Sequence, residues 1–151
     1  MLIGNDVRLN SCNKGYHLNM YGPVKLFADR PEAVIEIGDK TRIHGSCLHA
    51  YSSIKIGSKC LIAANCNIID CSGHDLSFDD VDNRINTNGG ARPIIIEDSV
   101  WICANVTVLP GVTIGRGTVV STGSVVSNSL PPMVLAAGNP ARPILTYTKD
   151  K

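Results

Sequence analysis

Residues 94–126, IIIEDSVWICANVTVLPGVTIGRGTVVSTGSVV, carry the pattern that decides the fold. An aliphatic residue returns at every sixth position through the stretch, and a small or β-branched residue follows four positions after each one. The aliphatic positions are Ile96, Ile102, Val108, Ile114, Val120 and Val126, and the small positions are Val100, Val106, Val112, Thr118 and Ser124. Two interleaved series that share one period indicate a repeated structural unit.

The same period reaches back toward the N-terminus in shorter runs. Aliphatic residues at this spacing are Ile3 and Leu9, then Ile37 and Ile43, then Ile56, Ile62 and Ile68. The small position holds Val7, Thr41, Cys47, Cys60 and Cys66. Cysteine behaves there as a small apolar core residue. Between the second and third runs the register shifts by one residue, and we expect this shift near His49.

A six-residue unit is long enough for one short strand and one turn. Three such units close a triangular coil, and successive coils stack at the inter-strand spacing of about 4.8 Å. Each coil pairs its backbone only with its neighbours, so residues 1–151 are expected to form one all-β domain, a parallel β-helix. A β-sandwich of short strands is the alternative, but a sandwich does not require a strict period of six.

The period fails between about residues 71 and 93, CSGHDLSFDDVDNRINTNGGARP. His74 lies six positions after Ile68, where the next aliphatic residue would fall, and the period resumes at Ile96. A long insertion in a regular solenoid is more often functional than ornamental. We therefore expect a protruding loop in which His74 is the candidate functional residue. A solvated excursion with an incidental histidine is the alternative.

The C-terminal tail, about residues 128–151, leaves the period in a different way. Pro131 and Pro132 cannot continue a hydrogen-bonded ladder. Residues 134–137 are suited to a last short strand that folds back, and residues 138–140, Gly-Asn-Pro, indicate a turn. Arg142 follows this turn as a candidate phosphate ligand. An ordinary capping segment for the end of the solenoid is the alternative.

Composition narrows the classes of function. Lys and Arg number 14 and Asp and Glu number 13, which gives a formal net charge of +1 and argues against a nucleic-acid partner. No apolar run is long enough to cross a membrane or to drive export, so we expect a soluble cytoplasmic protein without membrane insertion. The cysteines form no Cys-x-x-Cys pair, which disfavours a cysteine-based metal site.

Three motifs accompany the repeats: Trp101-Ile102, Gly138-Asn139-Pro140, and Gly73-His74 within IIDCSGHDL. In this combination the sequence resembles the hexapeptide-repeat acyltransferases. The most similar branch contains the maltose, galactoside, xenobiotic and polysaccharide O-acetyltransferases. The resemblance covers about residues 54–145. It implies a left-handed parallel β-helix that uses acetyl-CoA as co-substrate and needs no metal.

The resemblance also implies roles for single residues. His74 matches the general base, which removes a proton from an acceptor hydroxyl, and Asp70 matches an aspartate that orients this ring. The residues expected to bind the cofactor are Trp101, Ala104, Thr122, Ser127 and Arg142. Among them, Ala104 would offer its backbone N–H to the thioester oxygen. Asp75 and Arg84 of the loop are the expected contacts to the acceptor.

Two departures from the family pattern bear on these roles. Ser127 begins Ser-Asn-Ser where the family often has Thr-Lys-Asp, so one cationic contact to coenzyme A is missing. Cys103 replaces the usual glycine after Trp-Ile. The acceptor itself has no motif, and family analogy favours a hydroxyl of a sugar or polysaccharide precursor.

Two other functions and one assembly state need consideration. His44, His49 and His74 could hold zinc as in γ-type carbonic anhydrases, although the close pair comes last in that class and first here. Otherwise His44 and His49 are turn or surface residues, and either could contact the acceptor. A non-catalytic β-helix scaffold is the second alternative. A prism with three flat faces packs most simply as a cyclic homotrimer, in which the loop of residues 71–93 would lean across a neighbouring chain and share its active site.

Overall fold

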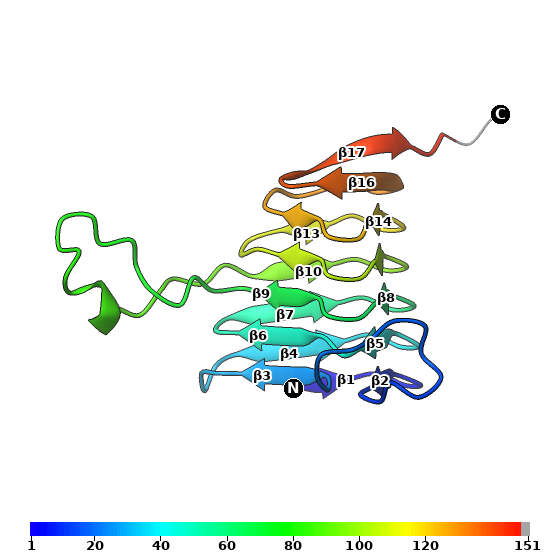
Figure 1. The fold of residues 1–151 in the computed structure, drawn as a ribbon, viewed down its shortest axis with the longest axis horizontal. Coiled ribbons are helices and arrows are strands. Elements are labelled where there is room, and N and C mark those ends of the chain that lie inside the picture. The colour runs from blue at the N-terminus through cyan, green and yellow to red at the C-terminus, as the bar shows by residue number, and fades with distance from the viewer. Residues whose placement is uncertain (149–151) are drawn as a thin grey trace.

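A computed structural model describes residues 1–148, and its strands wind into stacked triangular coils (Figure 1). Three sheets form the faces of the resulting prism. Sheet 1 contains β1 (Leu2–Ile3), β4 (Val34–Ile37), β7 (Ser53–Ile56), β10 (Ile94–Ile96) and β13 (Thr113–Ile114). Sheet 2 contains β2 (Arg8–Asn10), β5 (Arg42–His44), β8 (Leu61–Ile62), β11 (Trp101–Ile102), β14 (Val119–Val120), β16 (Val134–Gly138) and β17 (Ala141–Thr146). Sheet 3 contains β3 (Lys25–Ala28), β6 (Cys47–Ala50), β9 (Asn67–Ile69), β12 (Thr107–Val108) and β15 (Val125–Val126).

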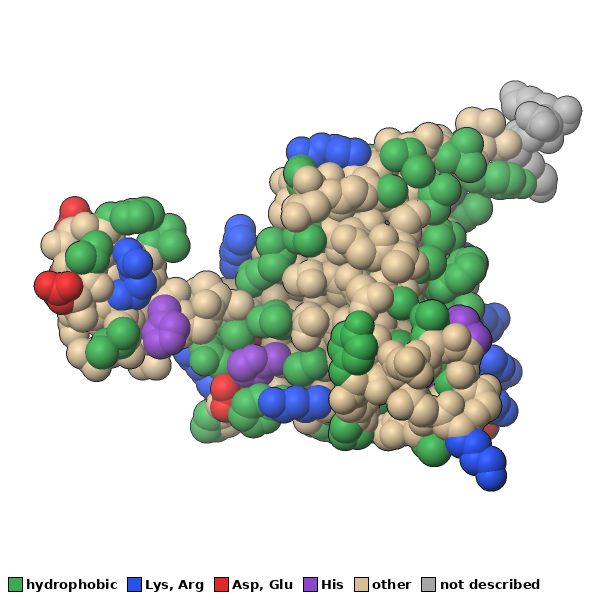
Figure 2. Space-filling model, in the orientation of Figure 1, with side chains coloured by type: hydrophobic (Ala, Val, Ile, Leu, Met, Phe, Trp, Pro, Cys, Tyr) green, Lys and Arg blue, Asp and Glu red, His purple; other side chains and the backbone are tan. Residues whose placement is uncertain are grey.

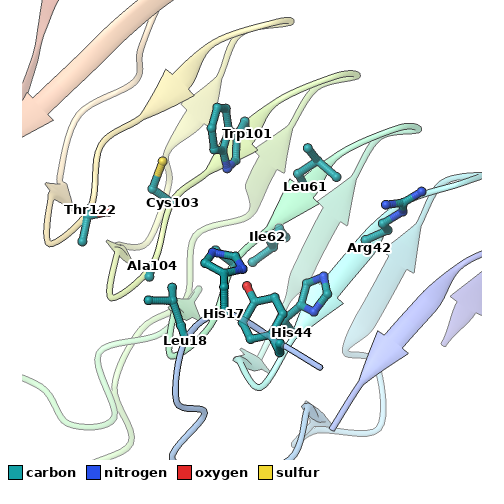
Figure 3. Close-up of a pocket in the computed structure, with 12 residues that line it drawn as sticks. His17, Leu18, Arg42, His44, Leu61, Ile62, Trp101, Cys103, Ala104 and Thr122 are labelled. Atoms are coloured by element: carbon teal, nitrogen blue, oxygen red, sulfur yellow. The ribbon is translucent and has the colours of Figure 1, made fainter. Parts of the chain in front are cut away.

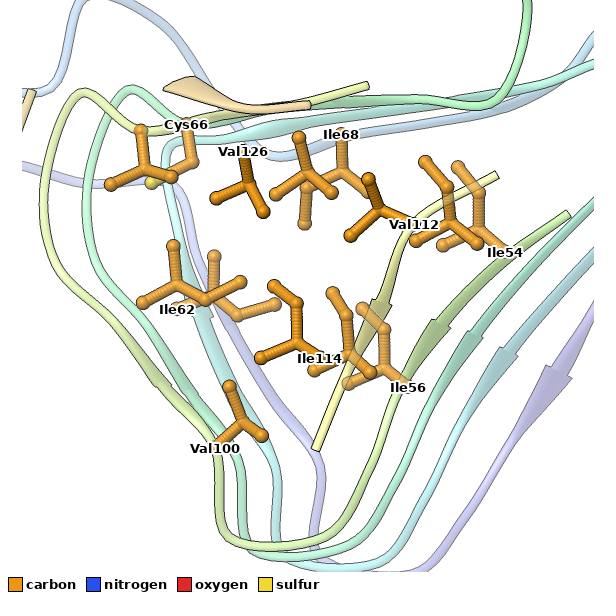
Figure 4. Close-up of a cluster of buried hydrophobic side chains, with 14 of the residues drawn as sticks. Ile54, Ile56, Ile62, Cys66, Ile68, Val100, Val112, Ile114 and Val126 are labelled. Carbon is orange, nitrogen blue, oxygen red and sulfur yellow. The ribbon is translucent and has the colours of Figure 1, made fainter. Parts of the chain in front are cut away.

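The period of six in the sequence becomes vertical stacking in the structure. Ile62, Ile102 and Val120 are register partners on adjacent strands of sheet 2, and all three are fully buried. Sheet 1 and sheet 3 contain equivalent columns, so the aliphatic side chains from three directions meet along one axis (Figure 4). Burying these aliphatic columns is the main driving force for the fold. The stacking of the three sheets confirms the predicted all-β parallel helix.

The smaller inward positions are buried as well, and the hydroxyl residues among them link neighbouring coils. Thr41 Oγ1 donates to the Gly57 carbonyl at 2.8 Å and accepts from the Cys60 N–H at 3.0 Å. Both bonds satisfy backbone groups at the turn of the next coil. A buried hydroxyl is therefore tolerated at these positions because its hydrogen-bonding capacity is used.

The prediction that Cys47 fills a core position is wrong. Ser46 is only 2% exposed and takes that place, and its Oγ donates to the Ala63 carbonyl and accepts from the Cys66 N–H. Leu48 then aligns with Ile68 on the neighbouring strand. The unit that begins at Ile43 is thus one residue short, and the register changes before His49.

Two segments leave the prism, and the C-terminus closes one end of it. Residues 11–24 connect β2 to β3, and residues 71–93 connect β9 to β10 and project to the side with the short 3-10 helix η1 (Arg84–Asn86) near the tip (Figure 1). β16 pairs in parallel with β14, and the chain folds back only at β17. The last residues of the predicted tail, 149–151, lie outside the described part. In residues 1–148 no helix is long and apolar enough to cross a membrane.

Candidate active site

A pocket of about 280 Å³ opens on the outer surface of sheet 2 (Figure 3). The upper part of the pocket is the part toward the C-terminal end of the prism. It is lined by Trp101 and Cys103 of the coil that contains β11, by Ala104 at the following turn, and by Thr122 one coil above. Trp101 points outward and is 47% exposed because inward and outward positions alternate along the short strand. Three of the five residues expected to bind the cofactor therefore meet in one pocket.

Ala104 presents an unused backbone donor at this pocket. Its side chain is 4% exposed, and its carbonyl accepts from the Gly123 N–H at 3.0 Å. Its own N–H takes part in none of the backbone or side-chain hydrogen bonds found within residues 1–148. An N–H that is held rigidly by a coil and has no partner is suited to stabilise a developing negative charge on an oxygen.

The thiol of Cys103 lies beside this donor. Burial raises the pKa of Cys103, although hydrogen bonding from Thr122 opposes that shift. The sulfur therefore stays protonated at neutral pH, and a thiol is a much weaker nucleophile than a thiolate. Cys103 shapes the pocket wall and is poorly suited to covalent catalysis.

Arg142 and Ser127 lie outside the pocket, toward the C-terminal end of the prism. Arg142 is exposed on β17, which follows β16 and β14 above β11 in sheet 2. Three strand steps separate β11 from β17, which corresponds to about 14 Å. Ser127 is exposed directly after β15 and accepts a hydrogen bond from Asn128. The expected phosphate ligand and the pocket are thus connected by the outer surface of one sheet.

His74 lies on the projecting loop, and its ring has a defined orientation. Nδ1 lies 3.2 Å from the carbonyl oxygen of Thr87. A carbonyl can only accept, so the neutral ring that makes this bond carries its proton on Nδ1. Nε2 then presents a lone pair to solvent, which is the tautomer that a general base requires. Thr87 also fixes Asp75, the residue after His74, because the Thr87 Oγ1 accepts a hydrogen bond from the Asp75 N–H at 2.9 Å.

The neck of the loop is narrow because two chain segments run side by side. Cys71 and Ala91 form an antiparallel bridge, and the Gly89 N–H donates to the Gly73 carbonyl. A Cβ on Gly89 would lie 2.7 Å from the Gly73 nitrogen, so the close approach requires glycine. This neck positions His74 relative to the prism.

Asp70 does not contact the His74 ring. Its carboxylate is fully buried and accepts from the Tyr51 N–H at 2.7 Å and the Ser52 N–H at 2.8 Å. Its backbone carbonyl accepts from the Arg92 N–H, at the root of the loop. The aspartate therefore fixes a turn of the coil below and the base of the loop, and the Thr87 carbonyl orients the histidine.

Replacing Asp70 with Asn is expected to lower the free energy of unfolding by ~1.5–3 kcal/mol, since the amide can accept only one of the two N–H donors. Urea denaturation would measure this loss. Asp98→Asn is the matched control, because Asp98 accepts the Ser58 N–H at an exposed turn, where a lost bond is replaced by water. Unchanged stability together with a large loss of turnover would instead support a direct role for Asp70 at His74.

The two loop residues expected to contact the acceptor also organise the loop. Arg84 Nε donates to the Leu76 carbonyl at 2.7 Å, and the Arg84 carbonyl accepts from Thr87 Oγ1. Asp75 is exposed and is tied to the loop through its backbone N–H. The carboxylate of Asp75 is thus presented to solvent on the same loop as His74.

The histidines that could have formed a zinc site lie apart. His44 bonds Asn10 on sheet 2, His49 bonds Asp29 on sheet 3, and His74 bonds Thr87 on the loop. Among the described residues no group of three or more His, Cys, Asp and Glu side chains could hold a metal ion.

Comparison with known proteins agrees with this geometry. The bacterial transferase hexapeptide family, with six repeats, matches residues 93–128. The chain is 32% identical to a hexapeptide-repeat acetyltransferase of Vibrio cholerae O1 biovar eltor whose crystal structure holds acetyl coenzyme A. That match covers 83% of this chain and 70% of the other, with a TM-score of 0.71. The chain belongs to the hexapeptide-repeat acetyltransferases.

Other members of this family match over different lengths. A galactoside acetyltransferase in complex with coenzyme A is 29% identical, with a TM-score of 0.78 over 96% of this chain and 64% of that one. The polysialic acid O-acetyltransferase of Escherichia coli O1:K1 / APEC is 44% identical over 60% of this chain and 28% of its own length. The chain spans between 28% and 48% of the length of the curated relatives that it matches.

In this hexapeptide-repeat acetyltransferase, one chain does not bring all the predicted residues together. None of the described residues that line the pocket comes from the loop of residues 71–93. The loop projects away from the prism, and hydrophobic side chains are exposed on it among polar and charged ones (Figure 2). Its most exposed apolar residues are Leu76, Phe78, Val81 and Ile85.

Apart from the acceptor-binding role considered for His44, the lower part of the pocket was not predicted from the sequence. It is lined by Tyr16, His17 and Leu18 of the segment 11–24, and by Arg42 and His44 of β5. Residues 11–24 interrupt the period between Leu9 and the strand that begins at Lys25, as residues 71–93 do later. The interruption at residues 11–24 was the available signal, but it carries no known motif.

Proposed function

We propose that the chain transfers an acetyl group from acetyl-CoA to a hydroxyl of a sugar or polysaccharide precursor, with His74 as the general base. The observation that carries this proposal is that the chain supplies both a free N–H donor for the acetyl oxygen and an imidazole nitrogen that can accept a proton. The Ala104 N–H is an unused donor in a pocket beside Trp101, and the Nδ1–H tautomer of His74 leaves Nε2 able to accept a proton. The V. cholerae relative holds acetyl coenzyme A, and the E. coli relative is a polysialic acid O-acetyltransferase.

The residues divide the reaction between them. His74 Nε2 takes the proton of the acceptor hydroxyl, so that the acceptor oxygen can form its bond to the acetyl carbon. The Ala104 N–H donates to the carbonyl oxygen of the acetyl group, which gains negative charge as that bond forms. His74 then gives the proton to the departing sulfur when the carbon–sulfur bond breaks. Acetyl-CoA supplies the activated acyl group.

A homotrimer supplies what one chain lacks. The loop with His74 lies apart from the pocket, and its four exposed apolar side chains are typical of a surface that packs against a partner. A cyclic trimer repeats one interface three times, so each loop can reach the pocket of the next chain. His74, Asp75 and Arg84 of one chain would then close the pocket that contains Ala104 of its neighbour.

The outer surface of sheet 2 offers a path for the rest of the co-substrate. Four apolar residues are register partners on successive strands from β11 to β17, and together they form a partly exposed apolar strip: Trp101, Val119, Leu135 and Leu145. This strip suits the pantetheine arm. The charged Arg142 at its upper end suits a phosphate, and Thr122 at the pocket is a hydroxyl donor on the same sheet side. Ser127, which follows β15 of sheet 3, stays a predicted hydroxyl donor to the cofactor.

Arg142→Ala is expected to raise the Michaelis constant for acetyl-CoA by about tenfold while turnover changes little. A phosphate contact on β17, three strand steps or about 14 Å above β11, is remote from the reacting thioester and so contributes equally to the ground and transition states. Steady-state kinetics with varied acetyl-CoA would measure the split. Arg116→Ala, on the sheet 1 side of the prism, is the control. An unchanged Michaelis constant would remove Arg142 from the cofactor site.

The proposed function is tested with the purified chain, acetyl-CoA and a panel of sugar acceptors. We expect release of the coenzyme A thiol that depends on an acceptor, and a sugar product heavier by one acetyl group in mass spectrometry. Thiol release no faster than without protein, for every acceptor, would favour a non-catalytic scaffold. Elemental analysis of the same preparation tests the prediction that the protein holds no zinc.

A further inference from the structure

The lower part of the pocket differs in chemistry from the part that contains Ala104. Its walls are Tyr16 and His17 from the segment 11–24, and Arg42 and His44 from β5 (Figure 3). No Asp or Glu is among the described residues that line the pocket. Given the proposed function, the acetyl group occupies the Ala104 end, so the acceptor enters from this lower end.

The segment 11–24 is a fixed wall. Met20 is 7% exposed and packs on Gly45, where a Cβ would lie 2.6 Å from Met20 Cγ. The side chain of Asn13 bonds both the N–H and the carbonyl of Met20, at 2.7 and 3.2 Å. Asn65 of the prism bonds the Tyr21 N–H and the Asn19 carbonyl, both at 2.9 Å. The shortened unit at Gly45 therefore makes room for an anchor that holds this wall in place.

His44 is held as a hydrogen-bond donor. The Cys12 N–H donates to Asn10 Oδ1 at 3.2 Å, which fixes the orientation of the amide. Asn10 Nδ2 then donates to His44 Nδ1 at 3.2 Å, so the neutral ring carries its proton on Nε2. The ring is stacked on Tyr16, with centroids 4.4 Å apart and planes inclined by 12°. Burial lowers the pKa of His44, and the charges of Arg42 and His17 lower it further, which keeps this tautomer neutral.

Arg42 adds a positive charge without an ion-pair partner at the same end. Its side chain is exposed and joins neither of the two ion pairs found within residues 1–148. A guanidinium and an imidazole N–H form a set of donors without an acceptor. Carboxylates and phosphates match such a set, because each offers several oxygens to a planar guanidinium. A neutral sugar would leave the charge of Arg42 without a partner.

We propose that Arg42 and His44 bind an anionic group of the acceptor, so that the substrate of this enzyme is a sugar that carries a carboxylate or a phosphate. The anion would lie at the lower end of the pocket, between β5 and the wall of residues 16–18. The sugar ring would then extend upward, with one hydroxyl near Ala104 and near His74 of the neighbouring chain. This inference rests on the proposed function for the position of the acetyl group.

The test compares acceptors that differ only in charge. Methyl β-D-glucuronoside and glucose 6-phosphate are each paired with the neutral parent sugar, and kcat/KM is measured at saturating acetyl-CoA. We expect the charged member of at least one pair to be favoured about tenfold or more. Arg42→Gln should lower kcat/KM for that acceptor ~10–100-fold and leave the neutral sugar within about twofold, since only a charge-assisted contact is lost. Arg42→Lys should restore part of the loss.

Arg8→Gln is the matched control. Arg8 pairs with Arg42 on the adjacent strand of the same sheet but does not line the pocket. It tests whether any positive charge on this face suffices, and it should keep the full preference. His44→Phe preserves the stacking on Tyr16 and removes the Nε2 donor, so the preference should fall while the fold stays intact.

A binding measurement separates this inference from the proposed function. Trp101 is the only tryptophan of the chain and lines the pocket, so its fluorescence reports on occupancy. The same two anionic sugars should change it in a saturable way, in the wild type and in Arg8→Gln but not in Arg42→Gln, at constant ionic strength. Saturable binding without any acetyl transfer would contradict the proposed function and leave the anion site standing. Equal use of charged and neutral acceptors, or equal effects of Arg8→Gln and Arg42→Gln, would overturn the inference.

Discussion

His74→Ala is expected to lower turnover by ~10²–10⁴-fold, which is the usual contribution of a positioned general base. The Michaelis constant for acetyl-CoA should change little, because the ring is not expected to bind the cofactor. His74 is exposed, and within residues 1–148 its ring hydrogen-bonds only the Thr87 carbonyl, so the substitution should leave the melting temperature nearly unchanged. Thiol release and thermal unfolding on the same preparation would measure both quantities.

His49→Gln is the control for this substitution. His49 is a partly buried histidine on β6 of sheet 3 whose Nε2 bonds Asp29, and it is not among the described residues that line the pocket. Its turnover should stay close to that of the wild type. A purified His74→Ala protein with turnover within a few-fold of wild type would exclude His74 as the base.

Ala104→Trp is expected to abolish measurable acetyl-CoA binding and to lower turnover by at least ~10²-fold. An indole at this position fills much of a pocket of about 280 Å³, and it occupies the space in front of the Ala104 N–H. Isothermal titration with coenzyme A would measure binding. Because Ala104 is buried, Thr122→Trp provides a second way to block the pocket, from an exposed position one coil above Ala104.

Lys55→Trp is the control for the blocking substitutions. Lys55 is exposed on β7 of sheet 1, so the same side chain is added to another face of the prism. It should bind coenzyme A as the wild type does. If Ala104→Trp and Thr122→Trp both retained wild-type affinity, the co-substrate would have to bind elsewhere.

The sequence predicts the coils of this protein well because their periodicity is a direct physical requirement. Each inward column must be apolar, so Ile62, Ile102 and Val120 recur at a fixed spacing that any reader of the sequence can see. The loop at His74 is visible for the same reason, as a gap in that spacing. The orientation of the His74 ring is not visible in the sequence, because the partner of the ring is the Thr87 carbonyl and a backbone carbonyl has no residue signature.

The errors have a common origin in contacts between distant segments. Cys47 was assigned to the core because the unit after Ile43 was counted as six residues. The unit is one residue shorter where Met20, from a segment more than twenty positions earlier, packs on Gly45. Asp70 was assigned to His74 from the family resemblance, but its carboxylate is already used by the turn at Tyr51. Neither contact follows from local pattern.

The most direct test of the account is a mixing experiment between two inactive chains. Chains with His74→Ala keep an intact pocket, and chains with Ala104→Trp keep an intact base. The two are unfolded and refolded together in equal amounts, and acetyl transfer is compared with that of each chain refolded alone. Light scattering should give the mass of a trimer for every preparation.

If the base of one chain serves the pocket of the next, every mixed cyclic trimer contains one interface with both parts intact. Random assembly then restores about one quarter of the wild-type activity, since each of the two required chains occupies its position half of the time. A refolded mixture no more active than the two mutants alone would contradict the shared site, as would a monomeric mass for the wild-type chain.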